Sequence, residues 1–306
     1  MASSTRRPRS GQVARFLTAA ATLVASLGAP TSDARAAGDL RALDRNGDGR
    51  VVIACLGDSN TDSNWQYVRP QGFPPGGGWC EQLGSLLDGR ATMVNLGMPG
   101  STAAWTELAQ AAEKGYYFTG ETQLEHAIAT HCPDVVLMAF GTNDVLPRYG
   151  YSPEQIVAAH LHLVRRALEA GILPFVATAP TPLPVPNRNV YSRPVEVVAE
   201  LNQRLRRALP PEMILDFEAR LTPEDSFDDL HMNVEGQRKR ALEAKEKLEA
   251  AVAALPVPPP APLGAAFDEG RCRVCPAAPP PWRPLGDASP GDVAPSAPSA
   301  PAEREG

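Results

Sequence analysis

The 306-residue sequence has no excess of basic residues. It contains 29 lysines and arginines against 35 aspartates and glutamates, which gives a formal net charge of −6 at pH 7. Proteins that bind nucleic acids through phosphate contacts usually carry a basic patch or stripe, and this charge balance gives no sign of one. We therefore expect no nucleic-acid partner.

The N-terminal region lacks a hydrophobic run long enough to span a membrane. The apolar segment "FLTAAATLVASLGA" at residues 16–29 has 14 residues, whereas a membrane-spanning helix needs about 20. It follows four arginines between residues 6 and 15 and precedes the small-x-small sequence at 34–36. This order is typical of a secretory signal peptide. We predict a signal peptide over residues 1–36, a secreted or periplasmic protein, and no integral membrane span after its removal.

Cysteine is scarce, with five residues in the chain. Cys272 and Cys275 form an isolated C-x-x-C pair, which supplies two of the four ligands of a structural zinc site. A local disulfide is the better interpretation of this pair. Export would permit other disulfides, and Cys80 and Cys132 are candidates to pair. Cys55 lies inside an apolar run, so we expect it to be a small buried hydrophobic residue.

A complete calcium-binding loop is also missing. The segment "DRNGDGR" at residues 44–50 places Asp44, Asn46 and Asp48 at the first ligand positions of such a loop. The loop needs a bidentate glutamate at its twelfth position, where this sequence has Cys55. We interpret the segment as a polar turn. We expect the protein to need no metal and no cofactor.

Proline is abundant but concentrated at the C-terminal end. Fourteen of the 32 prolines lie between residues 256 and 301, where apolar periodicity disappears. Such a composition is typical of a disordered or polyproline-rich tail. We therefore predict one domain over residues 37–255, long enough to bury a sizeable core, followed by a tail over residues 256–306.

Apolar runs alternate with helical patterns along this domain. The runs are rich in valine, isoleucine and leucine, and they lie at residues 50–57, 91–97, 134–141, 172–180 and 212–219. Near-continuous apolar runs indicate parallel strands that are covered on both faces. Helical patterns start near residues 79, 101, 152, 193 and 233. The alternation predicts the α/β class, with a doubly wound five-stranded parallel sheet between helices.

Polar residues follow the predicted strands at the points where ligands bind in α/β sheets. Such ligands lie beyond the carboxyl ends of the strands. The first three strands are followed by Ser59, Gly100 and Asn143, and the loop before the last helix carries Asp228 and His231. Each residue alone would be an ordinary turn residue. Because they share one rim of the sheet, we take them together as the candidate site.

These residue types suit nucleophilic attack on a carboxylic ester. A serine hydroxyl is a weak nucleophile and needs an adjacent base. His231 can accept its proton, and Asp228 can hold the imidazole in the required tautomer. The backbone N–H groups of Ser59 and Gly100 and the amide of Asn143 are suitable donors to the oxyanion. The set predicts an esterase that works through an acyl-enzyme.

Four short motifs resemble the four sequence blocks of SGNH (GDSL-type) hydrolases. They are "GDSNT", "NLGMPGST", "GTND" and "DDLHMN", and the resemblance covers residues 51–255. It implies a flavodoxin-like three-layer α/β/α sandwich and an esterase or lipase activity that needs no metal. Residue by residue, it implies a catalytic Ser59, His231 and Asp228, with Gly100 and Asn143 as oxyanion donors.

The sequence departs from that family pattern at two positions. Asn60 stands where many members carry an aliphatic residue, and Met232 stands where proline often follows the histidine. The loop before His231 is also crowded with acidic residues, so Asp225 or Asp229 remains an alternative to Asp228 as its partner.

Two other functions remain open at this point. The same site could transfer an acyl group to a glycan hydroxyl, as an O-acyltransferase does. Alternatively, "GDSNTDSN" could form an anion-binding nest in a non-catalytic binding module.

The substrate could be a small acyl ester, a lipid or an acetylated glycan. The loop at residues 66–78 could shape the mouth of the substrate pocket. Candidate walls of the pocket are the aromatic residues Trp65, Trp79, Trp105, Tyr116, Tyr117 and Phe118, although core packing suits Trp79 and Trp105 better because they lie on helical patterns.

Overall fold

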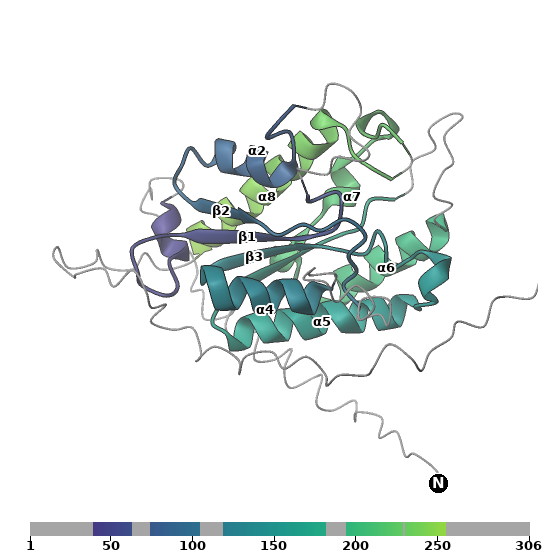
Figure 1. Cartoon of the computed structure of the whole chain (residues 1–306), viewed down its shortest axis with the longest axis horizontal. Coiled ribbons are helices and arrows are strands. Elements are labelled where there is room, and N and C mark those ends of the chain that lie inside the picture. The colour runs from purple at the N-terminus through teal and green to yellow at the C-terminus, as the bar shows by residue number, and fades with distance from the viewer. Residues whose placement is uncertain (1–38, 63–73, 105–118, 182–193, 229, 255–306) are drawn as a thin grey trace, which may run out of the picture. The chain divides into compact units, whose positions relative to one another are not determined.

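The computed structural model describes residues 39–62, 74–104, 119–181, 194–228 and 230–254 (Figure 1). All of them belong to one compact unit of the chain. The predicted signal peptide, the tail with its C-x-x-C pair, and the candidate pocket residues Trp65, Trp105 and Tyr116 lie outside the described residues. The predicted domain boundaries therefore stay predictions.

The core of the domain is a parallel sheet of five strands in the order β2-β1-β3-β4-β5. The strands are β1 (Val52–Gly57), β2 (Thr92–Asn95), β3 (Val135–Ala139), β4 (Leu173–Ala177) and β5 (Ile214–Leu215). All neighbouring strands are parallel. Each strand lies within one of the five predicted apolar runs, so the predicted α/β fold is confirmed.

Helices fill the connections between the strands. The α-helices are α2 (Trp79–Leu86), α4 (Gly120–His131), α5 (Pro153–Glu169), α6 (Val195–Ala208), α7 (Phe217–Arg220) and α8 (Val234–Ala254). Short 3-10 helices occur at η1 (Leu40–Leu43), η2 (Pro147–Tyr149), η3 (Pro211–Met213) and η4 (Pro223–Asp225). Within the described part of the chain, no helix is both long and apolar enough to cross a membrane. Most of the helical pattern predicted from Ser101 lies outside the described residues.

The helix termini follow local sequence signals. At the start of α5, the Ser152 hydroxyl accepts the N–H of Gln155, whose side chain accepts the N–H of Ser152 in return. This capping box, with Pro153 at the first helical position, confirms the predicted start. Helix α4 was not predicted, although Thr119 and Thr122 form a similar capping box before it. Its apolar residues are less clearly confined to one face than those of α5, which hid its periodicity.

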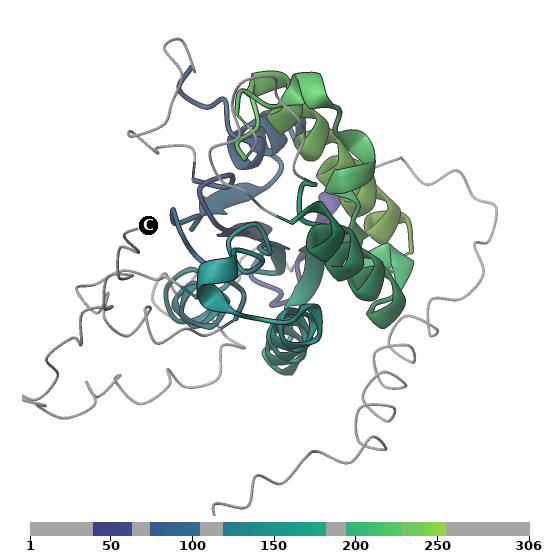
Figure 2. The ribbon, with the colours of Figure 1, turned by 90° about the vertical axis from the view of Figure 1, so that its right-hand side faces the viewer.

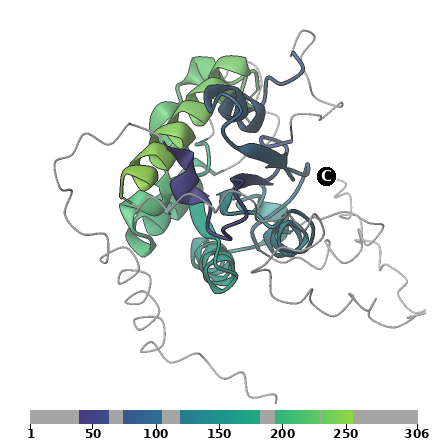
Figure 3. The same ribbon diagram turned by 90° about the vertical axis from the view of Figure 1, so that its left-hand side faces the viewer.

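Helices cover both faces of the sheet. Along β1, Ile53 and Cys55 belong to a buried cluster with side chains of α2, α7 and α8. Ala54 and Leu56 belong to a second cluster with α4, α5 and α6. Figure 1 shows α2 and α8 on one side of the strands and α4 and α5 on the other, and Figures 2 and 3 show these layers from the two ends. The strands are apolar on both faces because both faces are covered.

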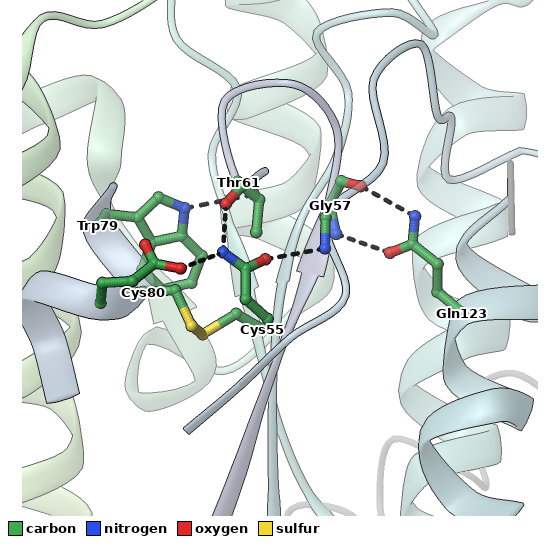
Figure 4. The surroundings of a disulfide bond; sticks show 9 residues. Cys55, Gly57, Thr61, Trp79, Cys80 and Gln123 are labelled. Carbon is green, nitrogen blue, oxygen red and sulfur yellow. Dashed lines mark hydrogen bonds between the residues drawn. A yellow bond between two sulfur atoms is a disulfide. The ribbon is translucent and has the colours of Figure 1, made fainter. Parts of the chain in front are cut away.

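A disulfide joins Cys55 of β1 to Cys80 of α2, with their Cα atoms 6.2 Å apart (Figure 4). The candidate pairing of Cys80 with Cys132 is therefore excluded, and the interpretation of Cys55 as an unbonded hydrophobic residue is wrong. The side chain at position 55 faces the α2 layer, where Cys80 lies in the first helical turn. Cys132 follows α4 on the opposite face of the sheet, and it too is no free thiol.

Replacing Cys55 and Cys80 together with alanine should lower the free energy of unfolding. The disulfide joins residues 25 positions apart. A cross-link of that length lowers the entropy of the unfolded chain, which stabilises the folded state by about 3 kcal/mol. Urea unfolding of the double variant and the oxidised wild type would measure the difference. A loss below about 1 kcal/mol would contradict a stabilising role of this disulfide.

Candidate active site

The predicted site residues lie where the strand order of the sheet reverses. The chain leaves β1 toward β2 on one side, whereas β3 pairs with β1 on its other side and continues toward β4. In open α/β sheets, the crevice beyond the carboxyl ends at such a switch point binds ligands. Ser59 follows β1, Gly100 follows β2 and Asn143 follows β3, so all three reach this rim.

Ser59 lies in a tight turn at the end of β1. The carbonyl of Asp58 accepts the N–H groups of Thr61 and Asp62 at 2.9 and 3.0 Å. The turn can form close to β3 because residue 57 is glycine: a Cβ at this position would lie 2.7 Å from the carbonyl oxygen of Ala139. Glycine at position 57 therefore lets the turn that carries Ser59 lie against the end of β3.

Ser59, His231 and Asp228 form a continuous chain of hydrogen bonds. Ser59 Oγ lies 3.1 Å from His231 Nε2, and His231 Nδ1 lies 2.8 Å from Asp228 Oδ2. His231 and Asp228 are 3% and 7% exposed, while Ser59 is only partly buried. The hydroxyl at the accessible end of the chain is therefore backed by a buried base and a buried carboxylate.

Asp228 is held as a carboxylate. Burial raises its pKa, but hydrogen bonds from the His231 ring and from the backbone N–H groups of Leu230 and His231 outweigh this effect, so the pKa of Asp228 lies below its usual value. The other described candidate, Asp225, is bound instead to Lys239 at 2.7 Å, and Asp229 lies outside the described residues. The structure thus brings Asp228, and not Asp225, to His231.

The loop that carries His231 is fixed by its own side chains. The backbone carbonyl of His231 accepts hydrogen bonds from the hydroxyl of Ser226 at 2.8 Å and from the N–H of Phe227 at 3.1 Å. The Phe227 ring stacks on the imidazole, with the two planes at 15° and the centroids 5.7 Å apart. Sequence reasoning missed Phe227, because nothing in the motif signals a ring that covers the histidine.

The loops after β2 and β3 are joined to the nucleophile turn and to each other. Met98 donates its N–H to the carbonyl of Gly57 at 3.0 Å, and Asn143 Nδ2 donates to the carbonyl of Ser101 at 2.9 Å. In the loop after β2, between Met98 and Ser101, Gly100 adopts a left-handed backbone conformation with φ of 84°, which glycine tolerates best. A Cβ there would meet no atom within 4 Å. The backbone and amide N–H groups predicted as oxyanion donors therefore lie on connected loops.

Two buried side chains brace these loops, and neither role was predicted. Asp144 accepts the N–H groups of Ala103, Ala104 and Gly141 at 2.9–3.1 Å. Burial raises the pKa of Asp144 to about 6, although these three N–H groups act in the opposite direction. The Gln123 amide of α4 both accepts the N–H and donates to the carbonyl of Gly57 (Figure 4).

Helix α8 supports the nucleophile turn from the opposite layer through Arg240. Arg240 is 1% exposed, and its guanidinium carbon lies 4.6 Å from the centroid of the Phe217 ring. Its Nη1 donates to the carbonyl of Asn60 at 2.9 Å. Burial lowers the pKa of Arg240 to about 10, with the nearby Asp58 carboxylate opposing that shift. Arg240 therefore stays positively charged at neutral pH, in contact with the backbone of the nucleophile turn.

The carboxylates of the "DRNGDGR" segment are engaged with the backbone. Asp44 accepts the N–H groups of Gly47 and Gly49 at 2.7 and 2.9 Å, and Asp48 accepts that of Arg50 at 2.9 Å. Among the residues that the structure describes, no three His, Cys, Asp or Glu side chains are grouped as they would be around a metal ion.

A parallel α/β sheet with serine, histidine and aspartate in series at its carboxyl rim has the architecture of a hydrolase with a serine nucleophile. The model of the GDSL-like lipase/acylhydrolase family matches residues 55–239, more than half of the chain. The chain belongs to this family and is a carboxylic ester hydrolase of the SGNH/GDSL type. No curated protein matches the chain.

Solved esterases share the fold. A carbohydrate acetylesterase from Sinorhizobium meliloti is 20% identical, with a TM-score of 0.55 over 66% of this chain and 100% of that chain. An aryl esterase from M. smegmatis is 21% identical, with a TM-score of 0.55 over 65% of this chain and 99% of that one. A putative arylesterase from Agrobacterium tumefaciens is 20% identical, with a TM-score of 0.53 over 65% and 99%.

Replacing Asp228 with asparagine should lower kcat strongly and leave KM nearly unchanged. The amide removes the negative charge beside His231 and can present an N–H to Nδ1, which favours the wrong tautomer. We expect a loss of roughly 10²–10⁴ in kcat, measured with p-nitrophenyl acetate. The matched control is Asp225→Asn, which removes a carboxylate of the same loop that contacts Lys239 and should retain most activity. A loss below about fivefold for Asp228→Asn would contradict this role of Asp228.

Proposed function

We propose that the protein is an exported serine esterase that hydrolyses short-chain carboxylic esters through an acyl-enzyme on Ser59. The observation that carries the proposal is the hydrogen-bonded series from Ser59 through His231 to Asp228, with bonds of 3.1 and 2.8 Å. A nucleophile in contact with a base, which a third group orients, is the arrangement that activates a serine hydroxyl.

The reaction proceeds in two steps at this series. Ser59 Oγ attacks the ester carbonyl while His231 Nε2 takes the hydroxyl proton, and the Asp228 carboxylate stabilises the imidazolium. His231 then protonates the departing alkoxide, which leaves as an alcohol and gives the acyl-enzyme. In the second step, His231 removes a proton from water, the hydroxide attacks the acyl carbonyl, and the acid leaves as Ser59 regains its proton.

The negative charge on the carbonyl oxygen needs fixed hydrogen-bond donors. We assign this role to the backbone N–H groups of Ser59 and Gly100 and to the Asn143 amide. The bond from Asn143 Nδ2 to the carbonyl of Ser101 supports the assignment, because it orients the amide and uses one of its two N–H bonds. Donors that are already in place require little reorganisation during the reaction.

A small acyl group on a sugar or aromatic alcohol is the proposed substrate class. The support comes from the structures that share this fold, whose names describe a carbohydrate acetylesterase and aryl esterases. Within this class, an acetylated glycan fits an exported enzyme. Rates on esters from acetyl to palmitoyl and on acetylated xylan would order these substrates.

Export of the protein is supported by two independent features. Residues 1–36 have the pattern of a secretory signal peptide. The disulfide between Cys55 and Cys80 links the sheet to its helical layer inside the core, and such bonds persist mainly in oxidising compartments. A protein that folds outside the cytosol would retain this bond.

Ser59→Ala should abolish ester hydrolysis while leaving the fold unchanged. Removing the nucleophile should lower kcat by at least about 10⁴, with thermal unfolding close to that of the wild type because Ser59 is only partly buried. The control is Ser85→Ala, on an exposed serine of α2, which should leave turnover unchanged. If Ser59→Ala retained more than about a tenth of the wild-type kcat for p-nitrophenyl acetate, the proposed function would be wrong.

A further inference from the structure

The Asn60 side chain connects the nucleophile turn to the loop of His231. Its Nδ2 donates to the carbonyl of Leu230 at 3.2 Å, and its Oδ1 accepts the N–H of Met232 at 3.2 Å. The two bonds contact the backbone on both sides of His231. Asn60 immediately follows Ser59, so the same two chain segments meet twice, at the Ser59–His231 bond and at the Asn60 amide.

The backbone of Asn60 is also fixed. Its N–H is accepted by Asp58 Oδ1 at 2.8 Å, and its carbonyl accepts Gln237 Nε2 at 3.1 Å and Arg240 Nη1 at 2.9 Å. The residue is 2% exposed. Since Gln237 and Arg240 lie in α8, which follows the His231 loop directly, helix, loop and turn form one hydrogen-bonded unit around Asn60.

We propose that Asn60 is a positioning residue that sets the separation between Ser59 Oγ and His231 Nε2. This inference rests on the proposed function, because it assigns Asn60 a part in the reaction of that site. The two amide bonds oppose rotation of the peptide groups that flank His231, and such rotation would swing the imidazole away from Ser59. An aliphatic residue could fill the same volume but could neither donate nor accept a hydrogen bond.

The chemistry of the site makes this separation important. Proton transfer from Ser59 to His231 requires hydrogen-bond distance during attack, and a misplacement of about 1 Å in such a site can cost roughly a hundredfold in rate. Leu230 and Met232 are 4% and 2% exposed. In a variant without the Asn60 amide, water would therefore not readily replace it as the hydrogen-bond partner of their backbone groups. The loop would have to move in order to satisfy its carbonyl and N–H groups.

Asn60→Leu tests the proposal through kcat, KM and amide exchange. We expect kcat for p-nitrophenyl acetate to fall about 10–100-fold, with KM within about threefold because Asn60 is buried. Exchange of the Met232 amide, followed by NMR, should be at least about tenfold faster, since Asn60 Oδ1 is its acceptor. A purely structural role would lower the unfolding temperature without changing kcat in the folded protein.

The matched control is Asn202→Leu in α6. Asn202 is also buried, and its amide also makes two backbone bonds, both to Ala179 at 2.8 Å. We expect a similar loss of stability, with kcat within twofold of the wild type and unchanged exchange at Met232. Asn60→Asp is the second test variant, because it preserves size and the acceptor for Met232 but places an oxygen against the Leu230 carbonyl. Its kcat should fall as well.

The outcomes separate this inference from the proposed function. Hydrolysis by the wild type that disappears in Ser59→Ala, together with a selective kcat loss in both Asn60 variants and faster Met232 exchange in Asn60→Leu, would support both. Hydrolysis that depends on Ser59 but is unchanged in Asn60→Leu and Asn60→Asp would overturn the positioning role alone. A wild type whose ester hydrolysis does not depend on Ser59 would overturn the proposed function, and the role of Asn60 in the reaction with it.

Discussion

The hydrogen bond between Ser59 and His231 is the contact on which the rest of the site depends. It joins two residues 172 positions apart in the chain, so it depends on the tertiary fold and not on local structure. A serine at a turn is chemically unremarkable until an imidazole lies within hydrogen-bond distance of it. The fold therefore serves mainly to hold two short loops at a fixed separation.

Several elements maintain this separation from different directions. From the α4 layer, Gln123 holds both backbone groups of Gly57. From the other layer, Arg240 of α8 holds the carbonyl of Asn60, and the disulfide at Cys55 links β1 to α2. Asn60 adds direct bonds to the histidine loop. Buried, hydrogen-bonded polar groups of this kind favour one arrangement of the loops over alternatives.

The sequence allowed the strands and the candidate residues to be predicted, because both depend on short local patterns. An apolar run that ends in Gly57 and Ser59 indicates a buried strand and a turn without any knowledge of its neighbours. The partner of Cys55 and the role of Gln123 depend instead on which helix covers which face of the sheet, and local patterns do not contain that information. Asn60 had no explanation from the sequence, since its partners lie about 170 residues later.

Covalent labelling with a fluorophosphonate tests the central claim most directly, because the reagent reacts with a serine that a neighbouring base has activated. The site of attachment, found by peptide mass, and the rate of labelling are measured together. The account predicts attachment at Ser59, and labelling at least about a hundredfold slower in His231→Ala. Attachment at a different residue, or equally fast labelling of Ser59 without His231, would contradict it.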